Sequence, residues 1–493
     1  MLIENFVQKI IAANDYQELD RVYLFNRVQA LVGDGDVDSE AASDEEALLQ
    51  LVDLAVKRGK IPDDATSQEI LADQLADLAT PAPSKVNELF WNKYDENPKA
   101  ATDWFYDLCT TNNYVKKTAI AKNIVFSGTS SYGHPLEVTI NLSKPEKDPK
   151  AIAAAAKKKD TDYPKCDLCL ENEGYLGDYG KNARSNLRII RMNIGGEKWG
   201  MQYSPYAYFN EHCIFLDQIH EPMVINQQTL INLLEIVKTF PHYMVGSNAD
   251  LPIVGGSLLS HEHYQGGGHR FPMMNAAIKE ELTFAGYPAV HGGIVDWPMS
   301  DIRLISKDIE SLIELGTKII KKWQKYSDPE LDIVAETHDA RHHTVTPIAH
   351  KDGDEYVLEL VLRDNNTSEQ YPLGIFHPHQ DKWHIKKENI GLIEVMGRAI
   401  LPGRLKDELG GVKKYLLGQD NQITEIHLPW AKQLQAKHPD ISQQNVDEIL
   451  QHELLDVFDQ VLADAGVYKA DAAGEAGWQK FLATIGAEWS LNN

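Results

Sequence analysis

The first hundred or so residues carry apolar side chains at helical spacing. Ser43-Asp-Glu-Glu46 has the form of a capping box, which predicts a helix start. Apolar residues follow at positions 48, 51, 52, 55 and 56, and Gly59 and Pro62 end the run. We therefore expect a helical N-terminal region over residues 1–113.

Beyond this region the pattern changes to short apolar stretches typical of strands, first over residues 123–127 and 136–142. Residues 144–159 are charged and rich in lysine and alanine, which indicates a surface connection.

One order of elements then occurs twice. A strand over residues 212–219 precedes a helix with apolar positions 230, 233, 234, 237 and 240, and strands over 243–247 and 253–263 follow. Later, a strand over 294–304 and a helix over 309–323 precede a hairpin of residues 343–348 and 356–362. Two diverged copies of one α+β unit explain this order. We expect one copy in residues 114–290, a degenerate copy in 291–425 and a helical C-terminal region in 426–493.

The two copies differ in chemistry. Leu358-Glu-Leu360 stands roughly where the first copy has His261-Glu-His263, so at most one copy keeps reactive residues. We therefore expect the matching strand of the second copy to be chemically empty.

Charge and composition narrow the function. The 493 residues carry a formal net charge of −25, which repels nucleic acid over most of the surface but leaves room for a phosphorylated small molecule in a local pocket. Neither a leader segment nor a membrane-spanning run is present in the sequence, so we expect a cytoplasmic protein. Its four cysteines are too few for a disulfide framework.

The segment Asp250 to His269 contains the most informative residues. If it stays extended through Gln265, then His261, His263 and Gln265 project from one face by the two-residue period of a strand. A neutral imidazole is nucleophilic at physiological pH, which suits phosphoryl or nucleotidyl transfer. The alternative is a pair of polar residues on a solvent-facing strand, and the glycines on both sides of the segment favour a ligand site.

Cys166-Asp-Leu-Cys169 is compatible with a metal site, a redox pair or no function. The residues after it do not resemble a thioredoxin-like helix, and zinc needs two more ligands. His220 and His261 are the best candidates, which gives a Cys2His2 set.

Other common motifs are absent from the sequence. Gln265 stands where H-E-x-x-H requires its second histidine, and neither a Walker loop nor a G-x-G-x-x-G after a strand is present. A zinc protease, a P-loop fold and a dinucleotide fold are not supported.

The segment from Asp250 to Gly267, with the sequence DLPIVGGSLLSHEHYQGG, resembles the motif of class II galactose-1-phosphate uridylyltransferases over its whole length. The likeness continues in segments that begin at Cys166, Arg363, His377 and Lys386, so it covers most of the chain.

The resemblance implies two tandem histidine-triad-like halves and a ping-pong exchange of a uridylyl group. His263 would attack UDP-glucose, release glucose 1-phosphate, and pass the group to galactose 1-phosphate to form UDP-galactose. Gln265 matches the amide that contacts a phosphoryl oxygen, and the backbone carbonyl of His261 would orient the nucleophile. The residues expected near the phosphates are Asn248, Gly255, Gly256 and Ser257.

Further expectations follow. The better-known class I enzymes bind zinc through two cysteines and two histidines, and Cys166, Cys169, His220 and His261 fit that pattern by position, so a structural zinc is expected there. A homodimer is expected from the family, and no organic cofactor is expected. Sugar-phosphate oxygens could bind to basic residues near the end of the second copy, or these residues could be surface charges. They are Lys386, Lys387, Arg398 and Arg404.

Two other readings stay open. A different histidine-triad-like nucleotidyltransferase or hydrolase would share the nucleophile, and a nonenzymatic nucleotide- or zinc-binding protein would not use it. The preference among hexoses cannot be read from any motif.

Overall fold

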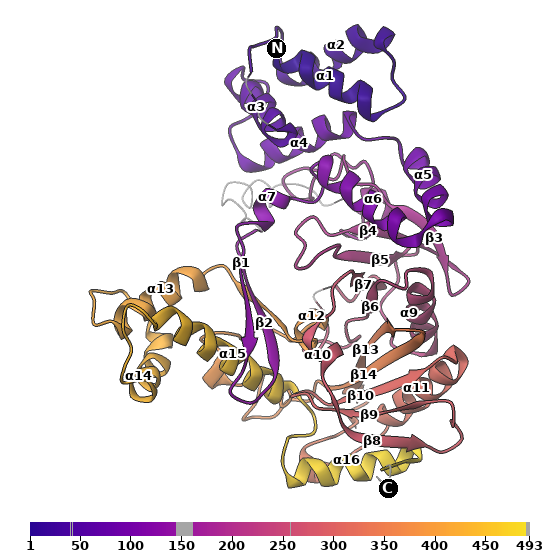
Figure 1. The fold of residues 1–493 in the computed structure, drawn as a ribbon, viewed down its shortest axis with the longest axis vertical. Coiled ribbons are helices and arrows are strands. Elements are labelled where there is room, and N and C mark those ends of the chain that lie inside the picture. The colour runs from indigo at the N-terminus through magenta and orange to yellow at the C-terminus, as the bar shows by residue number, and fades with distance from the viewer. Residues whose placement is uncertain (40, 42, 144–160, 257, 490–493) are drawn as a thin grey trace. The chain divides into compact units, whose positions relative to one another are not determined.

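The computed structural model describes residues 1–39, 41, 43–143, 161–256 and 258–489 (Figure 1). The predicted connection at 144–159 and the candidate Ser257 lie outside the described residues. The chain forms two compact units. The first contains residues 1–121, 143–207 and 211–221, and the second contains 122–142, 208–210 and 222–493.

Helices make up the N-terminal part of the first unit, as predicted. Ser43 accepts a hydrogen bond from the backbone N–H of Glu46, which caps α3. Buried apolar side chains of α1 to α4 form one core. The helices are α1 (Leu2–Ala13), α2 (Arg21–Val32), α3 (Asp44–Lys57), α4 (Ala65–Leu78), α5 (Pro83–Glu96), α6 (Pro98–Thr111) and α7 (Lys117–Ile120), with 3-10 turns at Glu18–Asp20 and Leu170–Asn172.

Three antiparallel strands complete the first unit in the order β5-β4-β3. They are β3 (Ile190–Ile194), β4 (Glu197–Tyr203) and β5 (Cys213–Asp217). Helix α5 packs on β3, where the indole N–H of Trp91 donates to the carbonyl oxygen of Arg191 at 3.1 Å.

A large antiparallel sheet forms the centre of the second unit, in the order β16-β8-β9-β10-β14-β13-β6-β7. Its strands are β6 (Met244–Gly246), β7 (His263–Gly267), β8 (Ile278–Phe284), β9 (His291–Val295), β10 (Asp301–Ser306), β13 (His343–Asp352), β14 (Glu355–Asp364) and β16 (Ala487–Trp489). Two short strands, β11 (Glu336–Thr337) and β12 (Ala340–Arg341), form a separate hairpin.

Helices α9 (Gln227–Thr239) and α11 (Ile309–Trp323) contact each other and cover one face of this sheet (Figure 1). Gly316 of α11 permits the close approach, because a Cβ atom there would lie 2.8 Å from Leu230 and 3.0 Å from Leu358. The remaining helices are α10 (Pro272–Asn275), α12 (Leu392–Val395), α13 (Leu405–Leu416), α14 (Leu428–Lys437), α15 (Val446–Ala465) and α16 (Ala472–Ile485), with 3-10 turns at Pro329–Leu331, Gln380–Lys382 and Glu425–His427.

The register shows which side chains share the opposite face. Residues directly opposite each other in an antiparallel pair project to the same side. Gln265 is opposite Gly246, Gly246 is opposite Ile348, and Ile348 is opposite Glu359. His263 precedes Gln265 by two residues, so it lies on the same face as Glu359. We call this the site face.

A second, smaller sheet packs in the same unit. Its order is β1-β2-β15, with β1 (Ile124–Thr129) antiparallel and β15 (Arg398–Pro402) parallel to β2 (Pro135–Asn141). Helix α15 packs against β1 and β2, and the shared core extends to α12, α13 and α14.

The predicted α+β class and the repeated order are confirmed: three strands, a helix and two strands occur as β3-β4-β5-α9-β6-β7 and as β8-β9-β10-α11-β13-β14. The predicted strand over 253–263 was wrong, because residues 253–256 and 258–262 form no strand and β7 begins only at His263. The predicted strand over 294–304 is two strands, β9 and β10, with a bend between them.

Candidate active site

His263 is the first residue of β7 and is 7% exposed. Its Nδ1 atom lies 2.8 Å from the backbone carbonyl oxygen of His261. A carbonyl oxygen can only accept, so Nδ1 carries the proton and Nε2 presents its lone pair. Burial lowers the pKa of His263 to about 4, which keeps the imidazole neutral at physiological pH. The geometry is that of a nucleophile with a fixed tautomer.

Gln265 follows His263 on the same face of β7, and the residue opposite it on β6 is a glycine. Gly246 lies opposite Gln265, and a Cβ atom on Gly246 would lie 2.7 Å from the side chain of Leu392. The missing side chain therefore lets the segment around Leu392 lie against the site face. His261 precedes the strand, so the predicted three-residue alignment holds only for His263 and Gln265.

The neighbours of His263 along the chain face the other way. The Tyr264 hydroxyl donates to Glu262 at 2.6 Å and accepts from the side-chain amide of Asn232, on α9, at 3.0 Å. Glu262 and Tyr264 thus anchor β7 to the helical layer and are not part of the site face.

Asn248 lies two residues after β6, and its side-chain Oδ1 accepts from the backbone N–H of Leu392 at 2.9 Å. A Cβ atom on Gly256 would come within 2.9 Å of the Asn248 side-chain nitrogen, and one on Gly255 within 2.4 Å of the Ala249 carbonyl oxygen. The structure brings three of the four predicted phosphate-site residues together in one corner, which we call the Asn248 corner.

Asp250 holds this corner to the sheet. Its buried carboxylate accepts from the Thr344 hydroxyl, from Arg341 at 2.7 Å and from the backbone N–H of Ile225 at 3.0 Å. The sequence places Asp250 at the start of the motif, but none of these partners could be predicted from spacing.

Three of the predicted metal ligands lie together in the first unit. The sulfur atoms of Cys166 and Cys169 are 3.5 Å apart, and the Cys169 sulfur lies 3.2 Å from Nδ1 of His220. A disulfide requires about 2.05 Å, whereas two thiolates on a tetrahedral zinc with bonds of about 2.3 Å are roughly 3.8 Å apart. The donor set therefore fits zinc. His261, of the second unit, belongs to the group that could hold a metal ion.

Two family models match the chain: the N-terminal domain of galactose-1-phosphate uridyl transferase over residues 14–222, and its C-terminal domain over residues 235–432. The galactose-1-phosphate uridylyltransferase of Lactobacillus helveticus is 66% identical over 487 residues, which cover 99% of each chain. The chain belongs to the galactose-1-phosphate uridylyltransferase family.

Other members of the family are similarly close. The enzyme of Pediococcus pentosaceus is 58% identical over 488 residues, which cover 98% of this chain and 99% of that protein.

Among solved structures, yeast Ap4A phosphorylase Apa2 covers 72% of this chain and 96% of its own, with a TM-score of 0.36 and 10% identity. That likeness is too distant to inform the site.

The matches correct one expectation. The motif at Asp250 pointed to class II, but the models that match are the N- and C-terminal domain models of galactose-1-phosphate uridyl transferase, and not a type 2 family. A motif of eighteen or so residues resolves a subfamily less well than models that span both halves of the chain. As a family member, the chain is a nucleotidyltransferase of galactose metabolism, and the neutral imidazole of His263 on β7 is compatible with that chemistry.

Three of the basic residues considered for sugar phosphate in this uridylyltransferase have carboxylate partners of their own. Lys386 is 2.6 Å from the buried Glu394, Arg398 is 2.6 Å from Glu137, and Arg404 pairs with Glu408 within its helix end. These contacts support structural roles for Lys386 and Arg398.

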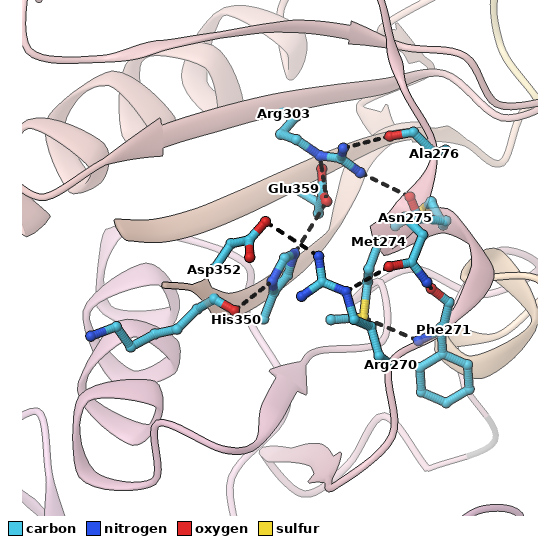
Figure 2. A network of polar contacts seen from close by, with 11 residues as sticks. Arg270, Phe271, Met274, Asn275, Ala276, Arg303, His350, Asp352 and Glu359 are labelled. Atoms are coloured by element: carbon cyan, nitrogen blue, oxygen red, sulfur yellow. Dashed lines mark hydrogen bonds and ion pairs between the residues drawn. The ribbon is translucent and has the colours of Figure 1, made fainter. Parts of the chain in front are cut away.

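The second copy is not chemically empty. Glu359 is fully buried on the site face and accepts from Nε of Arg303 at 2.8 and 3.0 Å, and His350 lies 3.4 Å from the same carboxylate (Figure 2). Asp301, also fully buried, lies on the same face two residues before Arg303. Sequence reasoning missed this network because its members lie on three strands, and charged residues inside apolar stretches were the only signal.

In the described part of the chain, no helix is long and apolar enough to cross a membrane.

Proposed function

We propose that His263 carries the uridylyl group in the reaction of this family. Nε2 attacks the α-phosphorus of UDP-glucose, the bond from that phosphorus to the bridging oxygen breaks, and glucose 1-phosphate leaves with the electron pair. A phosphate oxygen of galactose 1-phosphate then attacks the same phosphorus, and the N–P bond breaks to return neutral His263. The buried imidazole, held by the His261 carbonyl, is the observation that supports this route.

The carbonyl contact has a specific use in this cycle. The uridylylated imidazole keeps its proton on Nδ1 and becomes cationic, so the carbonyl dipole of His261 stabilises the intermediate as it forms. No base has to remove a proton in either half-reaction. We assign to Gln265 a hydrogen bond from its amide to a non-bridging phosphoryl oxygen, and to Asn248, Gly255 and Gly256 the binding of the phosphates.

We further propose that zinc binds to Cys166, Cys169, His220 and His261. Bound zinc would supply a structural cross-link at the backbone that precedes the nucleophile. The homodimer expected from the family resemblance also stays a proposal, which light scattering of the purified protein tests.

One labelling experiment tests the nucleophile. The protein is incubated with UDP-glucose labelled in the uridine, and we expect label in an acid-labile, alkali-stable bond that leaves on addition of galactose 1-phosphate. His263→Asn should abolish labelling. The matched control is His350→Asn, because His350 is also a buried histidine on the site face whose pKa burial lowers to about 4.

The possible outcomes separate the candidate functions. Labelling that persists in His263→Asn shows that another residue is the nucleophile. Label from adenosine donors but not from UDP-glucose favours a different nucleotidyl enzyme, and no adduct with either contradicts the covalent route.

A further inference from the structure

Arg363 is a buried cation without a carboxylate partner. It is 1% exposed near the end of β14 and follows Glu359 by four positions, so it lies on the site face. One terminal nitrogen donates to the Thr346 hydroxyl at 3.1 Å and the other to the carbonyl oxygen of Ile390 at 2.9 Å, while Nε has no partner. Among the described residues, no carboxylate lies within ion-pair distance of this guanidinium. Glu394 acts on it electrostatically from further away, but that carboxylate pairs with Lys386 at 2.6 Å.

This arrangement is unfavourable, because moving a charge out of water carries a desolvation penalty, and here no carboxylate in ion-pair contact offsets it. Burial accordingly lowers the pKa of Arg363 to about 10. Arg303 shows the usual solution on the same face, where the buried guanidinium pairs with Glu359 (Figure 2). A buried guanidinium without an ion-pair partner does not stabilise the fold. Its charge is better explained by an interaction with an anionic ligand.

Arg363 connects to the Asn248 corner through a short series of contacts. It holds the carbonyl of Ile390, and two residues later the N–H of Leu392 donates to Oδ1 of Asn248 at 2.9 Å. Gly391, between them, lies so close that a Cβ atom would be 3.4 Å from the same oxygen. The segment held by Arg363 is therefore the segment that fixes the Asn248 amide.

The contact from Leu392 decides which way that amide points. With Oδ1 accepting from a backbone N–H, the Asn248 nitrogen faces Gly256 and presents its N–H groups there. Amide N–H groups that point toward Gly256 can donate hydrogen bonds to the oxygens of a phosphate.

We propose that Arg363 is a positioning residue for phosphate binding: it holds residues 390–392 so that Asn248 presents its amide N–H groups, and it places a positive charge behind them. The ligand class is the phosphate of a uridine nucleotide. The inference rests on the proposed function only in that Asn248 binds phosphate.

The test compares UMP with uridine, because only UMP carries the phosphate. Equilibrium binding of both ligands is measured by calorimetry in Arg363→Met and in the matched control Arg303→Met, which removes a buried guanidinium from the same sheet face. We expect Arg363→Met to weaken UMP binding at least tenfold and uridine binding less than twofold. Arg303→Met should change neither by more than twofold.

Equal losses for UMP and uridine in Arg363→Met show a merely structural role and overturn the proposal. So does unchanged UMP binding. Should a methionine variant fail to fold, Arg363→Lys and Arg303→Lys are compared in the same assays, and equal UMP affinity in these two variants is the overturning result.

A double variant separates this inference from the proposed function. If Arg363 acts partly through Asn248, then Asn248→Ala with Arg363→Met should lose less UMP affinity than the sum of the two single losses, since coupled effects are not additive. Additive losses contradict the connection. If Asn248→Ala itself leaves UMP binding unchanged, the assigned role of Asn248 fails, whereas labelling of His263 tests the route independently.

Discussion

Two buried acidic residues, Asp301 and Glu359, lie on the site face with Arg303. Substituting them one at a time tests which of the two carries the negative charge. Arg303 donates to Glu359 and to the carbonyl oxygens of Ala276 at 2.7 Å and Met273 at 2.8 Å. Burial beside the charge of Glu359 raises the pKa of Asp301 well above its usual range, which favours the protonated acid. With a proton on Asp301, the network would contain one cation, one carboxylate and one neutral acid.

This balance predicts unequal costs for the free energy of unfolding. Arg303→Met leaves Glu359 as an uncompensated buried charge, and we expect a loss of about 3–5 kcal/mol. Asp301→Asn replaces a neutral acid by a neutral amide and should cost less than about 1 kcal/mol. Glu359→Gln should cost roughly 1–2 kcal/mol, because Asp301 can then ionise in place of Glu359.

Urea unfolding at pH 7, followed by circular dichroism, measures all three variants against the double variant Asp301→Asn with Glu359→Gln. The double variant leaves Arg303 without a carboxylate, so its loss should approach that of Arg303→Met, about 3–5 kcal/mol. A loss of 3 kcal/mol or more in Asp301→Asn alone would refute the reasoning, since it would mean that Asp301 is ionised in the wild type.

Three further predictions concern other parts of the chain. Purified protein should contain about one equivalent of zinc, and Cys166→Ser should lose metal and thermal stability, whereas Cys109→Ala, at a buried thiol in α6, should keep the metal. Burial lowers the folded-state pKa of His350 to about 4, below the unfolded value of ~6.5. As the pH falls below ~6.5, the unfolded chain therefore binds a proton that the folded chain does not, and the free energy of unfolding decreases. The loss from this group should be about 2 kcal/mol between pH 7 and pH 5, and equal urea midpoint shifts in wild type and His350→Gln would contradict it. Gly246→Ala places a Cβ atom 2.7 Å from Leu392, so we expect a loss of about 1–3 kcal/mol in unfolding experiments and weaker UMP binding, with wild-type behaviour as the contrary result.

Local patterns predicted much of the fold. The cap at Ser43, the helices α9 and α11, and the hairpin of β13 and β14 each follow from periodicity and turn residues that lie within a few positions of one another. The strand predicted over 253–263 failed for a tertiary reason. Asp250 binds to Thr344 and Arg341, Gly255 packs on the backbone carbonyls of Ala249 and Leu251, and Gly256 packs on the Asn248 side chain. These contacts keep residues 253–256 out of a strand despite the apolar residues beside them.

The candidate site divides in the same way. His263 and Gln265 could be placed on one face from their spacing, and the Cys166 pair indicated metal from residue type alone. The contact between Leu392 and Asn248 joins residues 144 positions apart. The partners of Arg363, which are Thr346 and the carbonyl of Ile390, could not be predicted from the sequence either. Contacts of this kind depend on how strands pair, which one sequence does not reveal.

The two buried arginines of the site face show why burial and charge have to be considered together. With a net charge of −25, the protein repels the phosphates it has to bind, and exposed cations would be screened by salt and surrounded by carboxylates. A buried guanidinium is screened far less, and its field is directed through low-dielectric protein. Arg303 cannot serve this purpose, because Glu359 neutralises it. Arg363 has no carboxylate in ion-pair contact, and it holds the segment that contacts Asn248. Under our proposal, a phosphate bound at the Asn248 corner would offset part of the energetic penalty of burying that charge.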